Sequence, residues 1–138
     1  MTAGDSQPSI TRAEAEGMLA SSDVHVRLGL EFVKWGSEGV ALRFRPEAWV
    51  RDPATGAVHG GILATALDTA ACFAAIAAAG VDCSTLDLRC DYLRPALDEE
   101  FIVHGTPLRT GKRLAWADAT ISTLGGRVVA AGRGTFVW

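Results

Sequence analysis

The 138-residue sequence has no run of like charges, no CxxC pair and no cluster of histidines. Its 13 basic and 16 acidic residues give a formal net charge of −3, which offers little support for a nucleic-acid-binding surface. His25, His59 and His104 are far apart in sequence, and no metal-ligand spacing is visible. We therefore expect no nucleic-acid partner, no metal site and no bound cofactor.

The cysteines and the N-terminus bear on location and size. Three cysteines (Cys72, Cys83 and Cys90) without paired spacing are typical of reduced thiols, which predicts a cytoplasmic protein. The first 17 residues lack the basic start and the apolar stretch of a signal peptide. A chain of this length holds one domain, and its 49% apolar residues suffice for a core.

The stretch from Gly60 to Gly80 is nearly all apolar and long enough to suggest a membrane span. However, Asp68 lies at its middle, where insertion into lipid would cost about 2.5–3.5 kcal/mol. Most of the stretch is alanine rather than leucine or isoleucine, and aromatic or basic residues do not flank both ends. We therefore expect no membrane partner and interpret the segment as the buried helix of a soluble protein.

The rest of the chain predicts a short helix and several strands. Residues 11–14 fit a capping box, so a short helix is expected to run to about residue 20, after a loose tail. Residues 24–35 are mostly extended in character, and a turn at 36–39 follows. Further strands are predicted over residues 40–45, 86–92, 101–109, 114–123 and 128–137, with hairpin-like connections at 109–112 and 124–126.

These elements predict an α+β fold in which one long central helix is wrapped by an antiparallel β-sheet. A helix that is apolar nearly all round needs cover, and a sheet with one apolar face supplies it. Ala115, Ala117 and Ala119 share one face of their strand, so the sheet can approach the helix closely. We divide the chain into residues 1–22, a tail and short helix, and residues 23–138, a single domain.

The candidate site begins at His59-Gly60-Gly61, where two glycines open the long helix. The first amides of a helix lack intrahelical partners and favour negative charge, so they can hold a carbonyl oxygen that becomes an oxyanion. Asp68 shares a helix face with Thr65 and Cys72. The carboxylate is either catalytic or an acceptor for neighbouring loop amides, and His59 either takes part in the chemistry or pins its loop.

The motif His59-Gly60-Gly61 with an acid nine residues after the histidine, Asp68, resembles the PaaI-like acyl-CoA thioesterases of the hotdog fold. The resemblance extends to Thr85-Leu86-Asp87-Leu88, to Tyr92-Leu93-Arg94-Pro95-Ala96 and to the closing Gly132-Arg133-Gly134-Thr135-Phe136. It covers the chain from about residue 27 to the C-terminus. The His-Gly-Gly motif alone is weakly specific, but the combination is strongly specific.

The resemblance implies hydrolysis of an acyl- or aryl-CoA thioester, with coenzyme A entering only as part of the substrate. Asp68 attacks the thioester or activates water, the Gly60 amide polarises the carbonyl, His59 belongs to the catalytic set, and Thr85 helps to place the water. Contacts with the acyl group or coenzyme A are implied for Gly61, Thr69, Arg94, Pro95, Thr110, Gly111, Lys112 and Arg113. Lys112 and Arg113 suit phosphates, although two solvated charges at a turn are an alternative interpretation.

The resemblance also implies an assembly. It predicts a homodimer with a continuous sheet, commonly paired into a homotetramer, with the active sites at the dimer boundary. In this scheme Thr85 comes from the partner subunit, because within one chain Asp68 is expected to lie distant from Thr85. A lone subunit would also leave a sheet edge exposed.

One position departs from the family pattern. Many relatives carry Asn or Gln six residues before the histidine, whereas this chain has Pro53, which has no donor; Asp52 could substitute only if the loop is shifted. Two alternatives therefore stay open: a non-catalytic acyl-CoA-binding module and a hydroxyacyl-thioester dehydratase of the same fold. Val40, Phe73, Ile76 and the alanines are candidates to line an aromatic or a medium aliphatic acyl pocket.

Overall fold

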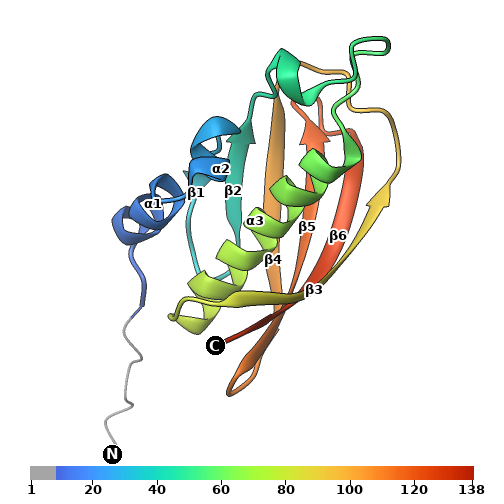
Figure 1. Cartoon of the computed structure of the whole chain (residues 1–138). Helices are drawn as coiled ribbons and strands as arrows, with labels where there is room; N and C mark the ends of the chain where they lie inside the picture. Colours follow the sequence, from blue (N-terminus) through green and yellow to red (C-terminus); the bar gives the residue numbers. More distant parts are fainter. Residues whose placement is uncertain (1–8) are drawn as a thin grey trace, which may run out of the picture.

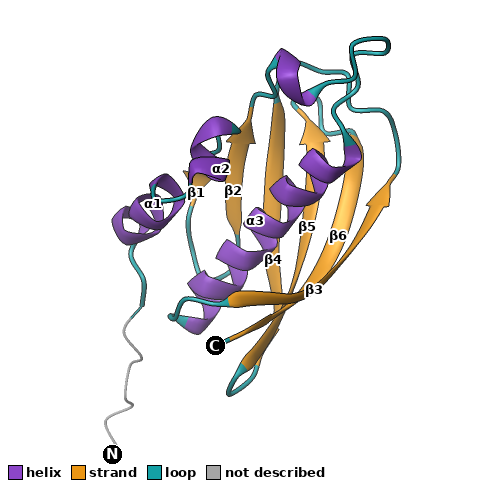
Figure 2. Cartoon of the chain, in the orientation of Figure 1, coloured by secondary structure: helices purple, strands orange, loops and turns teal. Residues whose placement is uncertain are grey.

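The computed structural model describes residues 9–138 and consists of one antiparallel sheet with a long helix across one face (Figures 1 and 2). The strand order is β1-β2-β4-β5-β6-β3. The helices are α1 (Arg12–Ala20), α2 (Asp23–Arg27) and α3 (Gly60–Ala79). The strands are β1 (Glu31–Lys34), β2 (Val40–Phe44), β3 (Ser84–Tyr92), β4 (Phe101–Thr110), β5 (Leu114–Thr123) and β6 (Val128–Val137), and one 3-10 turn covers Ala48–Val50. The predicted α+β architecture is confirmed.

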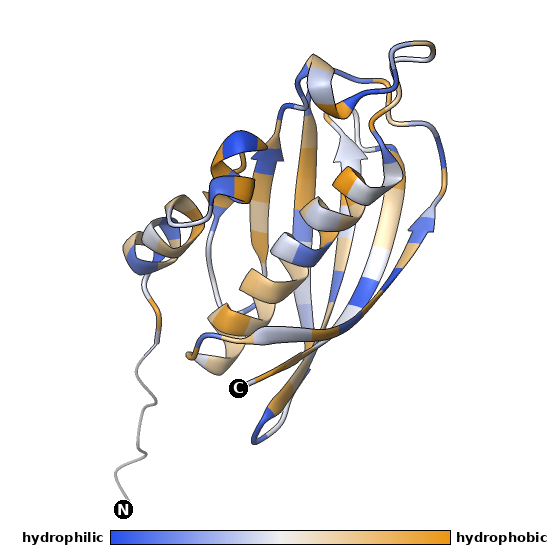
Figure 3. Cartoon of the chain, viewed as in Figure 1, coloured by the Kyte–Doolittle hydropathy of each residue, from blue (hydrophilic) through white to orange (hydrophobic). Residues whose placement is uncertain are grey.

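Helix α3 is the buried core helix that its composition predicts. It contains no proline, and it ends where Gly80 adopts φ +73° and donates its amide to the Ile76 carbonyl. The helix is long and apolar enough to cross a membrane, with a mean hydropathy of 1.8, but 61% of that apolar window is buried inside the protein. Figure 3 shows apolar residues along α3 and on the strands beneath it. The apolar stretch is therefore explained by the core and does not indicate a membrane.

The sheet approaches α3 closely because small residues face the helix. Ala115, Ala117 and Ala119 of β5 are at most 2% exposed, as their spacing predicts. On β4, a side chain at Gly105 would overlap the Ala70 carbonyl of α3 and come within 3.1 Å of the Ala74 Cβ. The depth of α3 against the sheet is therefore set at Gly105.

The N-terminal segment is partly different from the expectation. The capping box is present, since the Thr11 hydroxyl accepts from the Glu14 amide and the Glu14 carboxylate accepts from the Thr11 amide. Residues 24–35, however, are not extended throughout: α2 comes first, and Gly29 at φ +66° reverses the chain before β1. Val24 and Val26 are more than half exposed, and the helix packs its intervening residue, His25, against Phe73.

Strand β3 forms one edge of the sheet and is nearly all exposed. It pairs only with β6, and among residues 9–138 nothing covers its outer edge. The strict alternation expected for residues 86–92 is wrong at its start, because a register shift between Thr85 and Asp87 turns Leu86 outward, where it is 60% exposed. An open strand edge with exposed leucine is a surface suited to pairing with another chain.

Substitution of Gly105 tests the helix–sheet contact. We expect Gly105→Ala to lower the free energy of unfolding by about 1–3 kcal/mol or more, because the added methyl displaces α3 from the sheet. Gly17→Ala is the matched control: the position is helical with no atom within 4 Å of the added carbon, so a gain of up to about 1 kcal/mol is expected. Urea unfolding measures both, and equal stability of the two variants would contradict the proposed contact.

Candidate active site

The N-terminus of α3 presents two amides without intrahelical partners. The Ile62 and Leu63 amides donate back to the His59 carbonyl at 3.0 and 3.1 Å, which leaves those of Gly60 and Gly61. The His59 side chain is exposed and makes no capping hydrogen bond. Because Gly60 has no side chain, a ligand can come close to its amide. The amide can then donate a hydrogen bond to a polarised carbonyl oxygen.

Tyr92, at the end of β3, holds this helix terminus. Its hydroxyl donates to the Gly60 carbonyl at 2.8 Å, and a side chain at Gly60 would come within 3.3 Å of the tyrosine ring. Sequence reasoning noted Tyr92 only as part of a motif, because strand β3 and the start of α3 are 32 residues apart along the chain. The structure assigns it a supporting contact at the predicted amide site.

Asp68 lies midway along α3 and is half-buried. Its Oδ1 accepts a hydrogen bond from the Thr85 hydroxyl at 2.8 Å, and no loop amide in the described part of the chain donates to its carboxylate. The expectation that Asp68 and Thr85 of one chain lie distant is therefore wrong. Strand β3 begins directly after the turn at the end of α3 and runs back beside the helix, which brings Thr85 of the same chain to Asp68 (Figure 1).

The Gly60 amide and the Asp68 carboxylate lie apart on one helix. Eight residues separate them, and a rise of 1.5 Å per residue places them about 12 Å apart along the axis. Reacting groups need to come within about 3–3.5 Å of each other. A single chain therefore cannot direct both groups of α3 at one carbonyl.

A cavity of about 280 Å³ adjoins Asp68. Its lining comes from α1, α2, α3 and the loop before β3: Met18, Ser21, His25, Asp68, Thr69, Cys72, Phe73, Ile76, Asp82 and Cys83. Phe73 and Ile76 line it as expected, whereas Val40 does not: Val40 is 2% exposed and packs in the core between sheet and helix. Phe73 and Ile76 thus lie beside the candidate carboxylate, in a cavity whose other walls are largely polar.

Burial and neighbours shift the ionisation of groups in this cavity. Desolvation lowers the pKa of His25, and the Leu19 carbonyl and the Asp68 carboxylate oppose that effect only partly. The Cys72 and Cys83 thiols interact, which raises the pKa of Cys72 and lowers the pKa of Cys83. All three cysteines are free thiols. The lowered pKa of His25 favours its neutral form.

Two further predicted contacts belong to α3. Thr69 is 4% exposed, and its hydroxyl donates to the Thr65 carbonyl at 2.7 Å, so it can meet a ligand only as an acceptor. Gly61 is exposed, with open space where a side chain would lie. Thr69 lines the cavity next to Asp68, whereas Gly61 lies in the first turn of α3.

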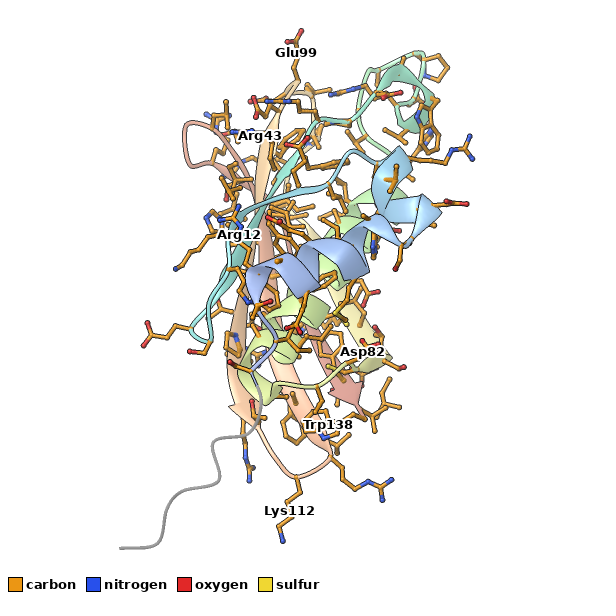
Figure 4. All side chains as sticks on the ribbon, turned by 90° about the vertical axis from the view of Figure 1, so that its left-hand side faces the viewer. Arg12, Arg43, Asp82, Glu99, Lys112 and Trp138 are labelled. Atoms are coloured by element: carbon orange, nitrogen blue, oxygen red, sulfur yellow. The ribbon has the colours of Figure 1, made fainter. Side chains whose placement is uncertain are left out.

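The residues predicted to hold coenzyme A fall at opposite ends of the sheet. Arg94 and Pro95 line a hollow with Arg127 beside the β5–β6 turn, and the Arg94 guanidinium donates to the Val128 carbonyl at 2.6 Å. The other predicted set, Thr110, Gly111, Lys112 and Arg113, is exposed at the β4–β5 hairpin. Figure 4 shows Lys112 and Glu99, which precedes β4, at opposite ends of the molecule. One chain does not bring these two segments together.

Asp52, in the loop before His59, accepts hydrogen bonds from amides of its own turn. Its Oδ1 accepts from the Ala54 and Thr55 amides at 2.8 and 2.9 Å, and these amides lower the pKa of the carboxyl. Asp52 thus stabilises the turn that contains Pro53. This conformation gives no support to Asp52 as a substitute for the amide side chain found in relatives.

Known proteins resemble this chain in sequence and structure. The Thioesterase superfamily profile matches residues 55–138. The medium/long-chain acyl-CoA thioesterase YigI of Escherichia coli K12 is 31% identical over an alignment of 106 residues, and the match covers 65% of this chain and 68% of YigI. A solved protein from the thioesterase superfamily has a TM-score of 0.85 at 30% identity and covers 90% of this chain and 95% of its own. The E. coli PaaI protein from the phenylacetic acid degradation operon has a TM-score of 0.80 at 20% identity, with 89% and 88% covered, and supports the fold.

Removing the Tyr92 hydroxyl tests the support of the α3 terminus. We expect Tyr92→Phe to lower the free energy of unfolding by about 0.5–1.5 kcal/mol, because one hydrogen bond to the Gly60 carbonyl is lost while the ring remains. Urea unfolding measures the change. Thr106→Val, which alters an exposed hydroxyl on β4, is the control and is expected to change stability by less than about 0.5 kcal/mol. An unchanged Tyr92→Phe variant would contradict the supporting role.

Proposed function

Because the chain belongs to the thioesterase superfamily, whose hotdog fold it has, we propose that it hydrolyses an acyl- or aryl-CoA thioester to the free acid and coenzyme A. The observation that carries this proposal is the environment of the Asp68 carboxylate. A half-buried carboxylate on an apolar helix has a single hydroxyl partner in the described structure and opens onto a cavity. A carboxylate needed only for structure would be expected to have its acceptor sites filled.

The proposed chemistry places the thioester carbonyl between an electron-pair donor and an amide donor. In one route Asp68 attacks the carbonyl carbon, coenzyme A leaves as the thiolate, and water cleaves the resulting anhydride. In the other route Asp68 takes a proton from water, the hydroxide attacks, and the proton passes to the departing sulfur. Thr85, which donates to Oδ1, orients the carboxylate in either route and leaves Oδ2 for the reaction.

The amide that receives the carbonyl oxygen comes from a second copy of the chain in this proposal. The separation of about 12 Å between Gly60 and Asp68 on one helix requires it. The exposed edge of β3 supports a dimer with a continuous sheet, and Tyr92 and Leu93 near its end are more than half exposed. A second copy could also bring its hairpin with Lys112 and Arg113 towards Arg94, so that segments from both chains hold coenzyme A.

One observation favours a second candidate, a non-catalytic acyl-CoA-binding module. Pro53 offers no donor, and Asp52 is committed to its own turn. Tight binding of acyl-CoA without thiol release would support the binding module instead of the hydrolase.

Superfamily membership favours hydrolysis over dehydration. We further propose that the enzyme acts in the cytoplasm, where its three thiols stay reduced.

Replacement of the carboxylate tests the proposed reaction. We expect Asp68→Asn to lower kcat by about 100-fold to 10,000-fold while the fold is kept, because the group that attacks or activates water is lost. Asp82→Asn is the matched control, since Asp82 lines the same cavity, and its kcat is expected to change by less than about threefold. Thiol release from acyl-CoA thioesters provides the measurement, and near-normal turnover of Asp68→Asn would remove Asp68 from the mechanism.

Heavy-oxygen water then separates the two routes for the same residue. A single turnover in this solvent, followed by mass analysis of the peptide that contains Asp68, is expected to leave label in the carboxylate only if Asp68 attacks the substrate directly. Label in the carboxylate therefore identifies direct attack, whereas label in the product acid alone arises from activated water or from water that opens the anhydride at the acyl carbon.

The assembly is tested at the open sheet edge. We expect the protein to sediment at twice or four times its 14.5 kDa chain mass, and Leu86→Glu to shift it towards the monomer because a charge is placed on the pairing edge. Leu124→Glu is the matched control, because Leu124 is equally exposed at 63% but lies on the β5–β6 turn. A monomeric unmodified protein would contradict the two-chain site.

A further inference from the structure

The Arg51 guanidinium donates to backbone carbonyls of two segments that lie far apart in the sequence. Its Nε donates to the Pro46 carbonyl at 3.3 Å, and its Nη1 donates to the Gly56 carbonyl at 2.9 Å and to the Leu97 carbonyl at 3.4 Å. Its Nη2 donates to the Asp98 carbonyl. A guanidinium has five N–H donors in a fixed planar fork, so these four bonds leave it little capacity to bind a ligand.

Arg51 belongs to a short hairpin, residues 50–59, that leads directly into α3 and is called the entry hairpin below. Arg51 takes part in a β-bridge across this hairpin, and the His59 amide donates to the Val50 carbonyl at 3.0 Å. The next residue, Gly60, is the first of α3. A displacement of the entry hairpin therefore moves the helix terminus together with its free amides.

The loop between β3 and β4 is the support to which Arg51 ties the entry hairpin. The Val58 amide donates to the Ala96 carbonyl at 3.0 Å, directly before the two carbonyls of residues 97–98 that accept from Arg51. Within residues 9–138, this amide and Arg51 supply the hydrogen bonds between the hairpin and the loop. The position of the helix terminus relative to the sheet therefore depends on this one side chain.

We propose that Arg51 is a positioning residue that holds the Gly60 amide where the thioester carbonyl oxygen is bound. This inference rests on the proposed function, since it requires that amide to receive the oxygen. A donor stabilises a developing oxyanion when it lies about 2.7–3.1 Å from the oxygen, so a small displacement of the helix terminus weakens the contact. Arg51 acts through the entry hairpin and does not itself touch the substrate.

Removal of the guanidinium tests this role. We expect Arg51→Met, which keeps an aliphatic stem, to lower kcat for thiol release by about 10-fold to 100-fold, because a misplaced amide stabilises the transition state less well. KM is expected to change by less than about threefold, since the lost interaction is made mainly in the transition state. Arg51→Lys has its donors at one point instead of along a fork, and its kcat is expected to lie between the two.

Arg12→Met is the matched control for a purely structural role. Arg12 also donates to backbone, at the Phe32 carbonyl (2.9 Å), but it links α1 to β1. Urea unfolding is expected to show lower stability for both variants, whereas kcat per folded protein is expected to fall only in Arg51→Met. Equal kcat values for the two variants overturn the inference. If Arg51→Met does not fold, an unchanged kcat in Arg51→Lys overturns it.

Binding measurements separate failure of this inference from failure of the proposed hydrolysis. The probes are S-octyl-CoA, which has no carbonyl, and S-(2-oxooctyl)-CoA, a ketone with one methylene between the sulfur and the carbonyl; neither can be hydrolysed. We expect the unmodified protein to bind the ketone about threefold to tenfold more tightly, since only the ketone accepts from the amide. Arg51→Met is expected to lose this preference, and Arg12→Met is expected to keep it.

The outcomes for the two proposals differ. A ketone preference that depends on Arg51, in a protein without turnover, supports Arg51 and overturns the hydrolase proposal. Turnover combined with a ketone preference that Arg51→Met retains overturns the role of Arg51 and leaves the hydrolase proposal standing. An unmodified protein that binds both probes equally also overturns the role of Arg51.

Discussion

Helix α3 lies in backbone contact with the sheet, and the absence of a side chain at Gly105 makes this contact possible. The small alanine side chains of β5 let the helix lie close to the sheet along the rest of the interface. Because the helix lies so deep, the sheet curls around it, and β3 at the edge passes close to the helix surface (Figure 1). The meeting of Asp68 with Thr85 and of Gly60 with Tyr92 both depend on that closeness.

The site that results is divided along one helix. Its N-terminal amides suit an oxyanion, and its middle carries the carboxylate, but two helical turns separate them. The division is a reason for assembly, because a second chain is needed to bring an amide to the carboxylate. The exposed edge of β3, with its outward-facing Leu86, provides a surface on which such pairing could form.

The residues that line the cavity next to Asp68 lie far apart in the sequence, from Met18 to Cys83. α1 and α2 close it on one side, and the turn after α3 closes it on another, which is why His25 and Cys83 share a wall with Asp68. Its walls combine the apolar side chains of Phe73 and Ile76 with the carboxylates of Asp68 and Asp82. Burial at this cavity lowers the pKa of His25.

Local patterns in the sequence determined much of this protein. The capping box at Thr11, the uninterrupted alanine-rich run of α3 and the glycines that open it depend on neighbouring residues, so they could be predicted. The segments that form β4, β5 and β6 could be predicted as well. The motif around Asp68 also led to the correct superfamily. Only the tertiary structure decided that Thr85 and Asp68 of one chain meet, that Leu86 turns outward at a register shift, and that α2 forms in a segment expected to be extended. These features depend on strand register, chain reversal at Gly29 and packing against distant residues, and none of these leaves a periodic signal in the sequence.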